Sequence, residues 1–306
     1  MDLRTLELKV ARSENLPVLP QVVSAAFKIV DDPKCTALDL ERLIDQDAAL
    51  TAKILRVVNS PMYAVGQVAT VGRALAVLGT NRVRSLITSI ALQNLAAERQ
   101  QASSFNKLEY WRHSLAVATA ARTIAKSARP AQMEELYVAG LLHDIGLLLM
   151  DKFCPDDLDS VISYAKGQGI PLCEAEAATG SFGHADLGAV LTQRWGMGDF
   201  LVNAVAKHHD PFVLADENSP AAVLFVADAL AHSTGFTNQV PSVQYDVSTD
   251  MFASVSIRED QVEGIRNLLC VELESVEKTF SFSGAPGASN ASPAVARSPR
   301  LSRLSA

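Results

Sequence analysis

Apolar residues recur along most of the chain at intervals of three and four, which is the period of an α-helix. Few runs alternate in the manner of a half-buried strand. The pattern predicts helices over residues 20–30, 37–58, 71–78, 81–95, 111–127, 133–150, 158–168, 171–180, 185–195, 200–208, 221–232 and 260–280. The sequence therefore predicts an all-α fold.

Two changes in composition divide the chain. The polar stretch 97–107 separates an N-terminal helical block from a longer one, as a linker or a loop. The final segment is built from Ser, Ala, Pro and Gly, with three arginines and no acidic residue, and can bury too little apolar surface to offset the entropy of ordering. We expect an N-terminal helical subdomain at 1–105, a second helical subdomain at 106–282 and a disordered tail at 283–306.

The composition describes a globular protein. Of 306 residues, 48% are hydrophobic, and 27 basic residues face 34 acidic ones, for a formal charge of −7. This balance argues against a nucleic-acid coat or a polybasic membrane-surface protein. The start of the sequence has no secretory signal, the apolar run 136–150 is too short to span a bilayer, and four dispersed cysteines fit a reducing compartment. We expect a cytoplasmic protein without a membrane span.

The candidate chemistry lies in histidine and aspartate. All six histidines fall between His113 and His232, and His143 is followed by Asp144 inside an otherwise apolar run. Asp228 lies in a similar run. A buried carboxylate is costly unless it is paired or binds a cation. Imidazole and carboxylate on neighbouring helices are the ligands expected for a first-row transition metal.

The order of these residues along the chain is similar to that of a known superfamily. His113, then His143-Asp144, then Asp228 resembles the H…HD…D pattern of the HD superfamily of metal-dependent phosphohydrolases. Further histidines match those of its binuclear branch. The resemblance implies one or two Fe, Mn or Zn ions and these ligands: His113, His143, Asp144, His184, His208, His209 and Asp228. Glu109 is a weaker candidate, and His232 is expected to be solvated. The alternative is that His143 and Asp144 form a purely structural pair.

A wider resemblance identifies one branch of that superfamily. Segments similar to the HDOD (HD-related output domain) family occur in order at 16–20, 47–51, 58–61, 76–79, 111–114, 140–146 and 208–209. The family implies an all-helical fold, in which an N-terminal bundle packs on a degenerate HD-type domain. It also implies a regulatory output module of bacterial signalling that lacks catalytic activity.

Two departures from the catalytic HD-GYP branch bear on activity. That branch has a lysine where this chain has Leu147, and a G-Y-P loop follows its paired histidines, whereas Asp210 and Pro211 follow His209 here. Loss of the lysine removes a charge that would stabilise a phosphoryl transition state. We therefore expect a regulator that binds a signalling protein or a small ligand without turnover. The alternative is a metal-dependent phosphohydrolase acting on a nucleotide or cyclic dinucleotide.

Two regions are further candidates for recognition. The cleft between the two predicted subdomains would bring Asn59, Ser60 and Tyr63 toward the histidines, and would form a ligand site. Residues 71–88 have the spacing of a helix-turn-helix, with Arg82 and Arg84 on its second helix. The acidic net charge favours an ordinary helix corner there, so we do not expect nucleic acid as a partner.

Overall fold

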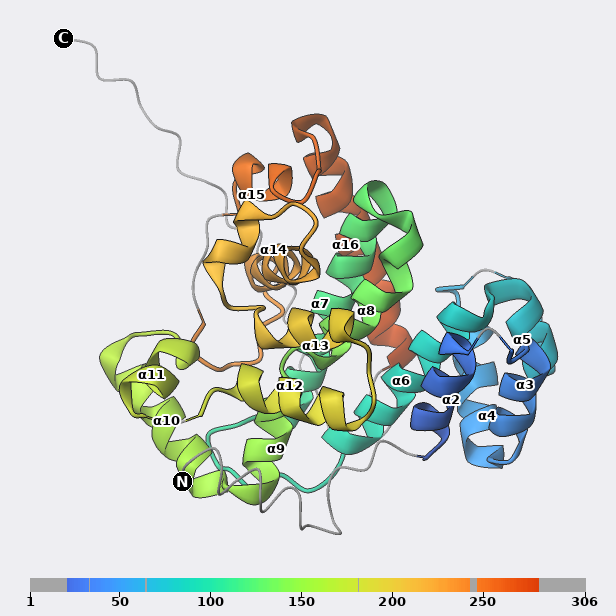
Figure 1. Cartoon of the computed structure of the whole chain (residues 1–306), viewed down its shortest axis with the longest axis horizontal. Coiled ribbons are helices and arrows are strands. Elements are labelled where there is room, and N and C mark those ends of the chain that lie inside the picture. Colours follow the sequence, from blue (N-terminus) through green and yellow to red (C-terminus); the bar gives the residue numbers. More distant parts are fainter. Residues whose placement is uncertain (1–20, 33, 64, 181, 243–246, 281–306) are drawn as a thin grey trace.

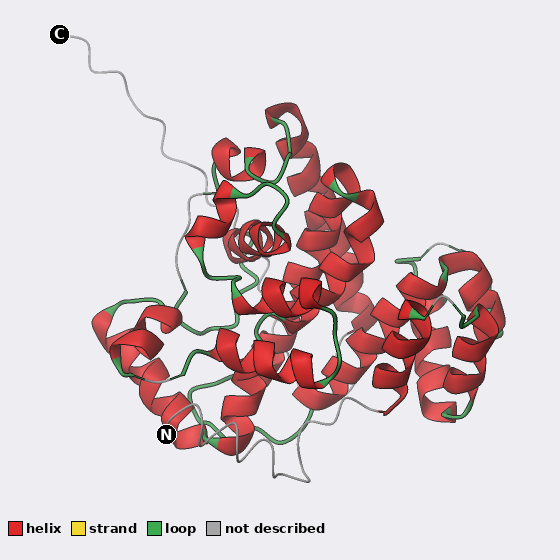
Figure 2. Cartoon of the chain, viewed as in Figure 1, coloured by secondary structure: helices red, strands yellow, loops and turns green. Residues whose placement is uncertain are grey.

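The computed structural model describes residues 21–280 except 33, 64, 181 and 243–246. Throughout that part the regular structure is helical and contains no strand, which confirms the all-α prediction (Figure 2). No helix in the described ranges is long and apolar enough to cross a bilayer. The predicted tail at 283–306 and the family-like segment 16–20 lie outside the described residues.

In the described part of the chain, five helices form the N-terminal region, and most of them lie together at one side of the molecule in Figure 1. They are α2 (Gln21–Asp31), α3 (Ala37–Asp45), α4 (Ala48–Val58), α5 (Val71–Leu78) and α6 (Thr80–Ala96). The prediction of one helix over 37–58 was wrong, because the chain breaks between α3 and α4. Asp47 starts α4 by accepting hydrogen bonds from the amides of Ala49 and Leu50, both at 3.0 Å.

The corner between α5 and α6 is part of the core. Gly79 ends α5 with a φ of +80°, a backbone conformation that residues with a side chain rarely adopt. Helix α6 is buried from Val83 to Leu92, and its Arg84 stacks over the ring of Phe27. The burial of α6 from Val83 onward supports an ordinary helix corner over a recognition helix.

The remaining helices form a larger bundle, in which α7 is central. They are α7 (Lys107–Ala128), α8 (Met133–Leu142), α9 (Ile145–Phe153), α10 (Pro155–Gln168), α11 (Leu172–Ala178), α12 (His184–Arg194), α13 (Asp199–Ala206), α14 (Pro220–Ser233), α15 (Thr249–Ala253) and α16 (Glu259–Phe280), with 3₁₀ turns at Pro130–Gln132 and Pro211–Ala215. Helix α7 packs against α6, α8, α14 and α16. One apolar core runs from the N-terminal helices through this bundle. The subdomain division at 105 and 106 stays a prediction.

The break between α8 and α9 positions the functional residues. One helix was predicted over 133–150, but the chain leaves the α-helix at His143 and Asp144. The ring of His143 turns back to the carbonyl of Gly140, at 2.8 Å, and Asp144 has φ −98° and ψ 13°. Just beyond the break, the backbone of Gly146 lies so close to the carbonyl of His184 that a Cβ atom would collide with it. The turn therefore presses α9 against the start of α12.

The polar stretch 97–107 is a packed loop and not a free linker. The buried carboxylate of Asp151 accepts hydrogen bonds from the amides of Gln101 and Ala102, at 2.9 and 2.7 Å. Asp159 accepts from the amides of Ser103 and Ser104, at 2.9 and 2.7 Å. Two aspartates from α9 and α10 thus attach the connection between α6 and α7 to the bundle.

Candidate metal centre

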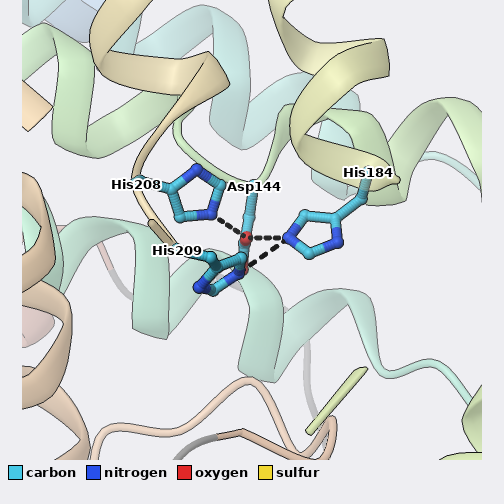
Figure 3. A group of neighbouring side chains, drawn as sticks. All are labelled: Asp144, His184, His208 and His209. Carbon is cyan, nitrogen blue, oxygen red and sulfur yellow. Dashed lines mark hydrogen bonds and ion pairs between the residues drawn. The ribbon is translucent and has the colours of Figure 1, made fainter. Parts of the chain in front are cut away.

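The seven predicted ligands lie together in two groups. We call them the four-residue group, Asp144, His184, His208 and His209, and the three-residue group, His113, His143 and Asp228. Within each group, one ligand atom from every residue lies within 4.8 Å of the others. They come from α7, the turn between α8 and α9, the start of α12, the segment after α13, and α14. Figure 3 shows the four-residue group, with the imidazole rings gathered around the carboxylate.

The carboxylate of Asp144, a member of the four-residue group, also faces the three-residue group. Its Oδ1 lies 3.3 Å from Nε2 of His184 and 3.4 Å from Nε2 of His208 (Figure 3). Its Oδ2 lies 3.4 Å from Nε2 of His143 and 3.9 Å from Nε2 of His113. A carboxylate with one oxygen toward each cluster can bridge two cations.

Four histidines are held in the orientation typical of metal ligands. In each, Nδ1 contacts a fixed oxygen: Phe236 O for His113 at 2.8 Å, Gly140 O for His143 at 2.8 Å, Val205 O for His208 at 2.7 Å, and Glu176 Oε1 for His184 at 2.9 Å. Carbonyl and carboxylate oxygens only accept hydrogen bonds, so Nδ1 is the donor in each case. In the neutral ring Nε2 then carries the lone pair, and it faces the centre.

This arrangement brings ring nitrogens face to face. Nε2 of His113 and Nε2 of His143 are 3.2 Å apart, and Nε2 of His184 and Nε2 of His209 are 3.0 Å apart. At that distance a proton or a cation must lie between the two nitrogens of each pair. Among the described residues, Nε2 of His208 is also buried without a hydrogen-bond partner. The donor set therefore fits a divalent cation.

The charges of the site also suit a cation. Burial alone would raise the pKa of Asp144, but His143, His184 and His208 hold it well below its usual range. Burial lowers the pKa of His209 well below 6.5, and the neighbouring His208 and His184 lower it further. Burial would also lower the pKa of His184, but Glu176 and Asp144 raise it well above that value. Asp144 is thus ionised and His209 neutral, the forms that bind metal, whereas a cation that binds at His184 displaces a proton from its ring.

Known proteins share the sequence pattern and the fold of this chain. The sequence profile of the HDOD domain matches residues 16–211. The chain belongs to the HDOD family. A solved HDOD domain protein of unknown function from Geobacter sulfurreducens is 23% identical, with a TM-score of 0.74 over 91% of this chain and 98% of its own. At this identity the likeness concerns the fold.

Other structures share the HDOD fold. A Shewanella amazonensis protein, provisionally named a phosphohydrolase, is 23% identical with a TM-score of 0.68, over 90% of this chain and 98% of its own. A Marinobacter aquaeolei protein, provisionally named a signal transduction protein, is 22% identical with a TM-score of 0.70, over 92% and 61%. An uncharacterized Treponema pallidum protein is 24% identical over 201 residues, which are 65% of this chain and 38% of that relative.

Two side chains near the ligand groups, His232 and Glu109, differ from the sequence-based expectation or fall outside the groups. His232 was expected to be solvated, but its side chain is only 7% exposed, and its Nε2 lies 3.4 Å from Oδ1 of Asp228. Its ring centroid is also 4.7 Å from that of His113. Glu109 pairs with Arg112 at 3.1 Å and is absent from both ligand groups. His232 is on the same helix face as Asp228, one turn later, so its spacing was an available signal.

Two polar residues that contact the ligands were missed. Glu176 in α11 is 2% exposed, and besides the ring of His184 it accepts the backbone amide of that residue at 3.0 Å. Asn238 donates its amide to Oδ2 of Asp144 at 2.8 Å. Asn238 is 94 positions from its partner, and no spacing rule links them. Only the tertiary structure brings them together.

The space beside the cluster is small. A pocket of about 20 Å³ is lined by ligand residues together with Leu147, Cys173, Asn238 and others between 113 and 242. The expectation that Asn59, Ser60 and Tyr63 approach the histidines was wrong, because no residue of the N-terminal helices lines it. The side chain of Asn59 bonds the backbone of Leu55 and Val68, and Tyr63 lies under Arg82.

Proposed function

We propose that this HDOD protein is a bacterial signal-transduction regulator that holds a divalent transition metal and acts by binding a protein or ligand, without turnover. The family and a fold shared with a provisionally named signal transduction protein support the regulatory role. The convergence of seven ligand side chains in two adjacent groups, with Asp144 between them, carries the metal proposal. Fe, Mn and Zn suit its imidazole and carboxylate donors.

The proposed ligands are the four-residue group and the three-residue group. When bound, a divalent ion supplies Lewis acidity to any phosphate oxygen that reaches it. The chain itself supplies oriented imidazoles from α7, α12 and the turn before α9, which are far apart in sequence. A cation bound at these residues would therefore tie separate helices together and stabilise the folded state.

The shape and charge of the pocket favour binding over turnover. A volume of about 20 Å³ has room for roughly one water molecule, well below the size of a phosphodiester. Its lining includes no lysine or arginine within the described part of the chain, and Leu147 lies where the catalytic branch has its lysine. The described lining thus offers no basic side chain to stabilise the charge of a phosphoryl transition state.

A partner surface is proposed next to the centre. Phe212 follows His209 by three residues, and it is 84% exposed, the highest value among the large apolar side chains described. Exposed aromatic side chains are frequent anchors of protein–protein contacts. We propose that a signalling protein contacts this residue. Phe212→Ala would reduce capture of that partner in crosslinking and mass spectrometry from native cells, while the control Phe200→Leu, at a partly buried position, would not.

The second candidate function is a phosphohydrolase acting on a nucleotide or cyclic dinucleotide. The position of Asp144, with one oxygen toward each ligand group, favours it, because binuclear phosphohydrolases use bridging carboxylates.

Two measurements test these proposals. Elemental analysis of purified protein should find about one or two Fe, Mn or Zn ions per chain. No metal after expression in supplemented medium would refute the metal proposal. A phosphodiesterase assay with added Mn or Fe should show no turnover that depends on His143. Activity that His143→Ala abolishes would replace the regulator with the phosphohydrolase.

A further inference from the structure

A second cavity lies away from the histidines, between the N-terminal helices and the end of α16. It has a volume of about 450 Å³. Its lining comes from α4, α6 and the last turn of α16: Lys53, Arg56, Val57, Ile90, Gln93, Asn94, Ala97, Lys278, Thr279 and Phe280. It shares no residue with the pocket of the metal centre. The cavity is therefore a separate feature of the molecule.

The lining of this cavity is positively charged, whereas the protein as a whole is negatively charged. Lys53, Arg56 and Lys278 line it, and no carboxylate occurs among its lining residues in the described part of the chain. The protein as a whole carries a formal charge of −7. Three cations gathered in a concave site raise the local potential and attract anions. The positive charge of the lining predicts that the cavity binds an anion.

The cavity walls are held in place by hydrogen bonds. Nζ of Lys53 donates to Oδ1 of Asn94 at 2.6 Å, which fixes a cation of α4 against α6. Nε2 of Gln93 donates to the backbone carbonyl of Phe280 at 2.7 Å, which joins α6 to the end of α16. The ring of Phe280 in turn packs edge-on against Trp111 in α7, with centroids 5.9 Å apart. The site is thus built from anchored elements.

The size and the apolar part of the lining narrow the ligand class. A volume of about 450 Å³ lies in the range of small-molecule sites, roughly 300–1,000 Å³. Val57, Ile90 and Ala97 supply apolar surface beside the cations. We propose that this cavity binds a nucleotide-sized phosphorylated molecule, with its phosphates on Lys53, Arg56 and Lys278 and its base on the apolar wall.

The chain's own C-terminal segment is a poorer occupant. Residues 281–306 follow Phe280 directly in the sequence and carry three arginines and no acidic residue. Positive charge from those arginines would repel the three cations of the cavity. A bound anion would instead contact α4, α6 and α16 at once, and so favour their observed packing.

Calorimetric titration of the full chain tests the proposal, with ATP, GTP and inorganic triphosphate as probes in EDTA, so that no metal takes part. At least one nucleotide should saturate one site with a Kd of about 1 mM or tighter, and should bind more tightly than triphosphate. Arg56→Glu should weaken that binding at least about tenfold, because it replaces attraction with repulsion. Lys166→Glu, the same charge change at an exposed position of α10, should leave it within about twofold.

Three results would overturn the proposal. No probe reaches saturation, the two charge reversals weaken binding equally, or triphosphate binds as tightly as the nucleotides. His143→Ala serves as a further control, since loss of binding in that variant would place the ligand at the metal centre. Circular dichroism of each variant confirms that it remains folded. Metal content is measured separately, so the metal proposal stands or falls independently of this one.

Discussion

The two ligand groups meet at Asp144 and differ in the way that one histidine is held. In the four-residue group, Nδ1 of His184 contacts the buried carboxylate of Glu176. In the three-residue group, Nδ1 of His113 and Nδ1 of His143 contact main-chain carbonyls. A carboxylate acceptor makes an imidazole a stronger electron donor than a neutral carbonyl does. We therefore expect the four-residue group to bind metal more tightly than the three-residue group.

The largest effect should follow from removing the shared carboxylate. Asp144→Asn should reduce bound metal to a small fraction of its normal content, since the four-residue group loses its one carboxylate and the three-residue group loses the charge beside His143. Asp228→Asn should remove metal only from the three-residue group. Elemental analysis of the two variants side by side measures the difference. Equal losses would contradict the sharing of Asp144.

The next largest effect is expected at Glu176, whose carboxylate accepts a hydrogen bond from Nδ1 of His184. Glu176→Gln removes the charge while keeping an acceptor, and should weaken metal binding at the four-residue group by about 10–100-fold. Competition with a chelator measures this affinity. Glu174→Gln, two residues earlier on α11 and exposed, is the matched control and should have no effect. If both variants behave alike, Glu176 is not a positioning residue for His184.

A smaller effect is expected at the amide that contacts Asp144. Asn238→Ala removes a hydrogen bond to a buried carboxylate, and should lower the free energy of unfolding by about 1–2 kcal/mol. Urea denaturation of the metal-free protein measures it. Asn218→Ala, at an exposed position, should change stability by less than about 0.5 kcal/mol. An equal effect of the two changes would mean that the contact with Asp144 adds nothing.

The smallest effect is expected at a carboxylate outside both groups. Burial would raise the pKa of Asp159, but Ser104 and Ser103 lower it to about 2 through hydrogen bonds. Because the pKa is lower in the folded state, ionised Asp159 stabilises the fold above about pH 4, and this contribution is lost as the pH falls through 2. Solvent screening limits it to about 1 kcal/mol or less. Asp159→Asn should flatten the acid limb of the stability curve, as thermal melts between pH 2 and 6 would measure.

The sequence predicted most helices but missed two breaks within them. Helical period is local, so apolar spacing alone located α6, α12 and α14 to within a residue or two at each end. The same spacing continues through Asp47 and through His143-Asp144, where the chain in fact leaves the helix. Both breaks depend on polar side chains that bond the backbone instead of continuing the turn. A periodicity argument carries no information about such bonds.

Residue type and order in the sequence, with a family resemblance, determined the all-helical class and the seven candidate ligands. These properties can be read from the sequence because helix formation depends on local spacing. A histidine or aspartate in an apolar run also stands out, since burying its polar group is costly unless the group is paired. The tertiary structure decided that Glu176, Asn238 and His232 contact the ligand residues. It also decided that Asn59 and Tyr63 lie away from them. Contacts across tens of residues depend on how helices pack, and packing is set by the whole core at once.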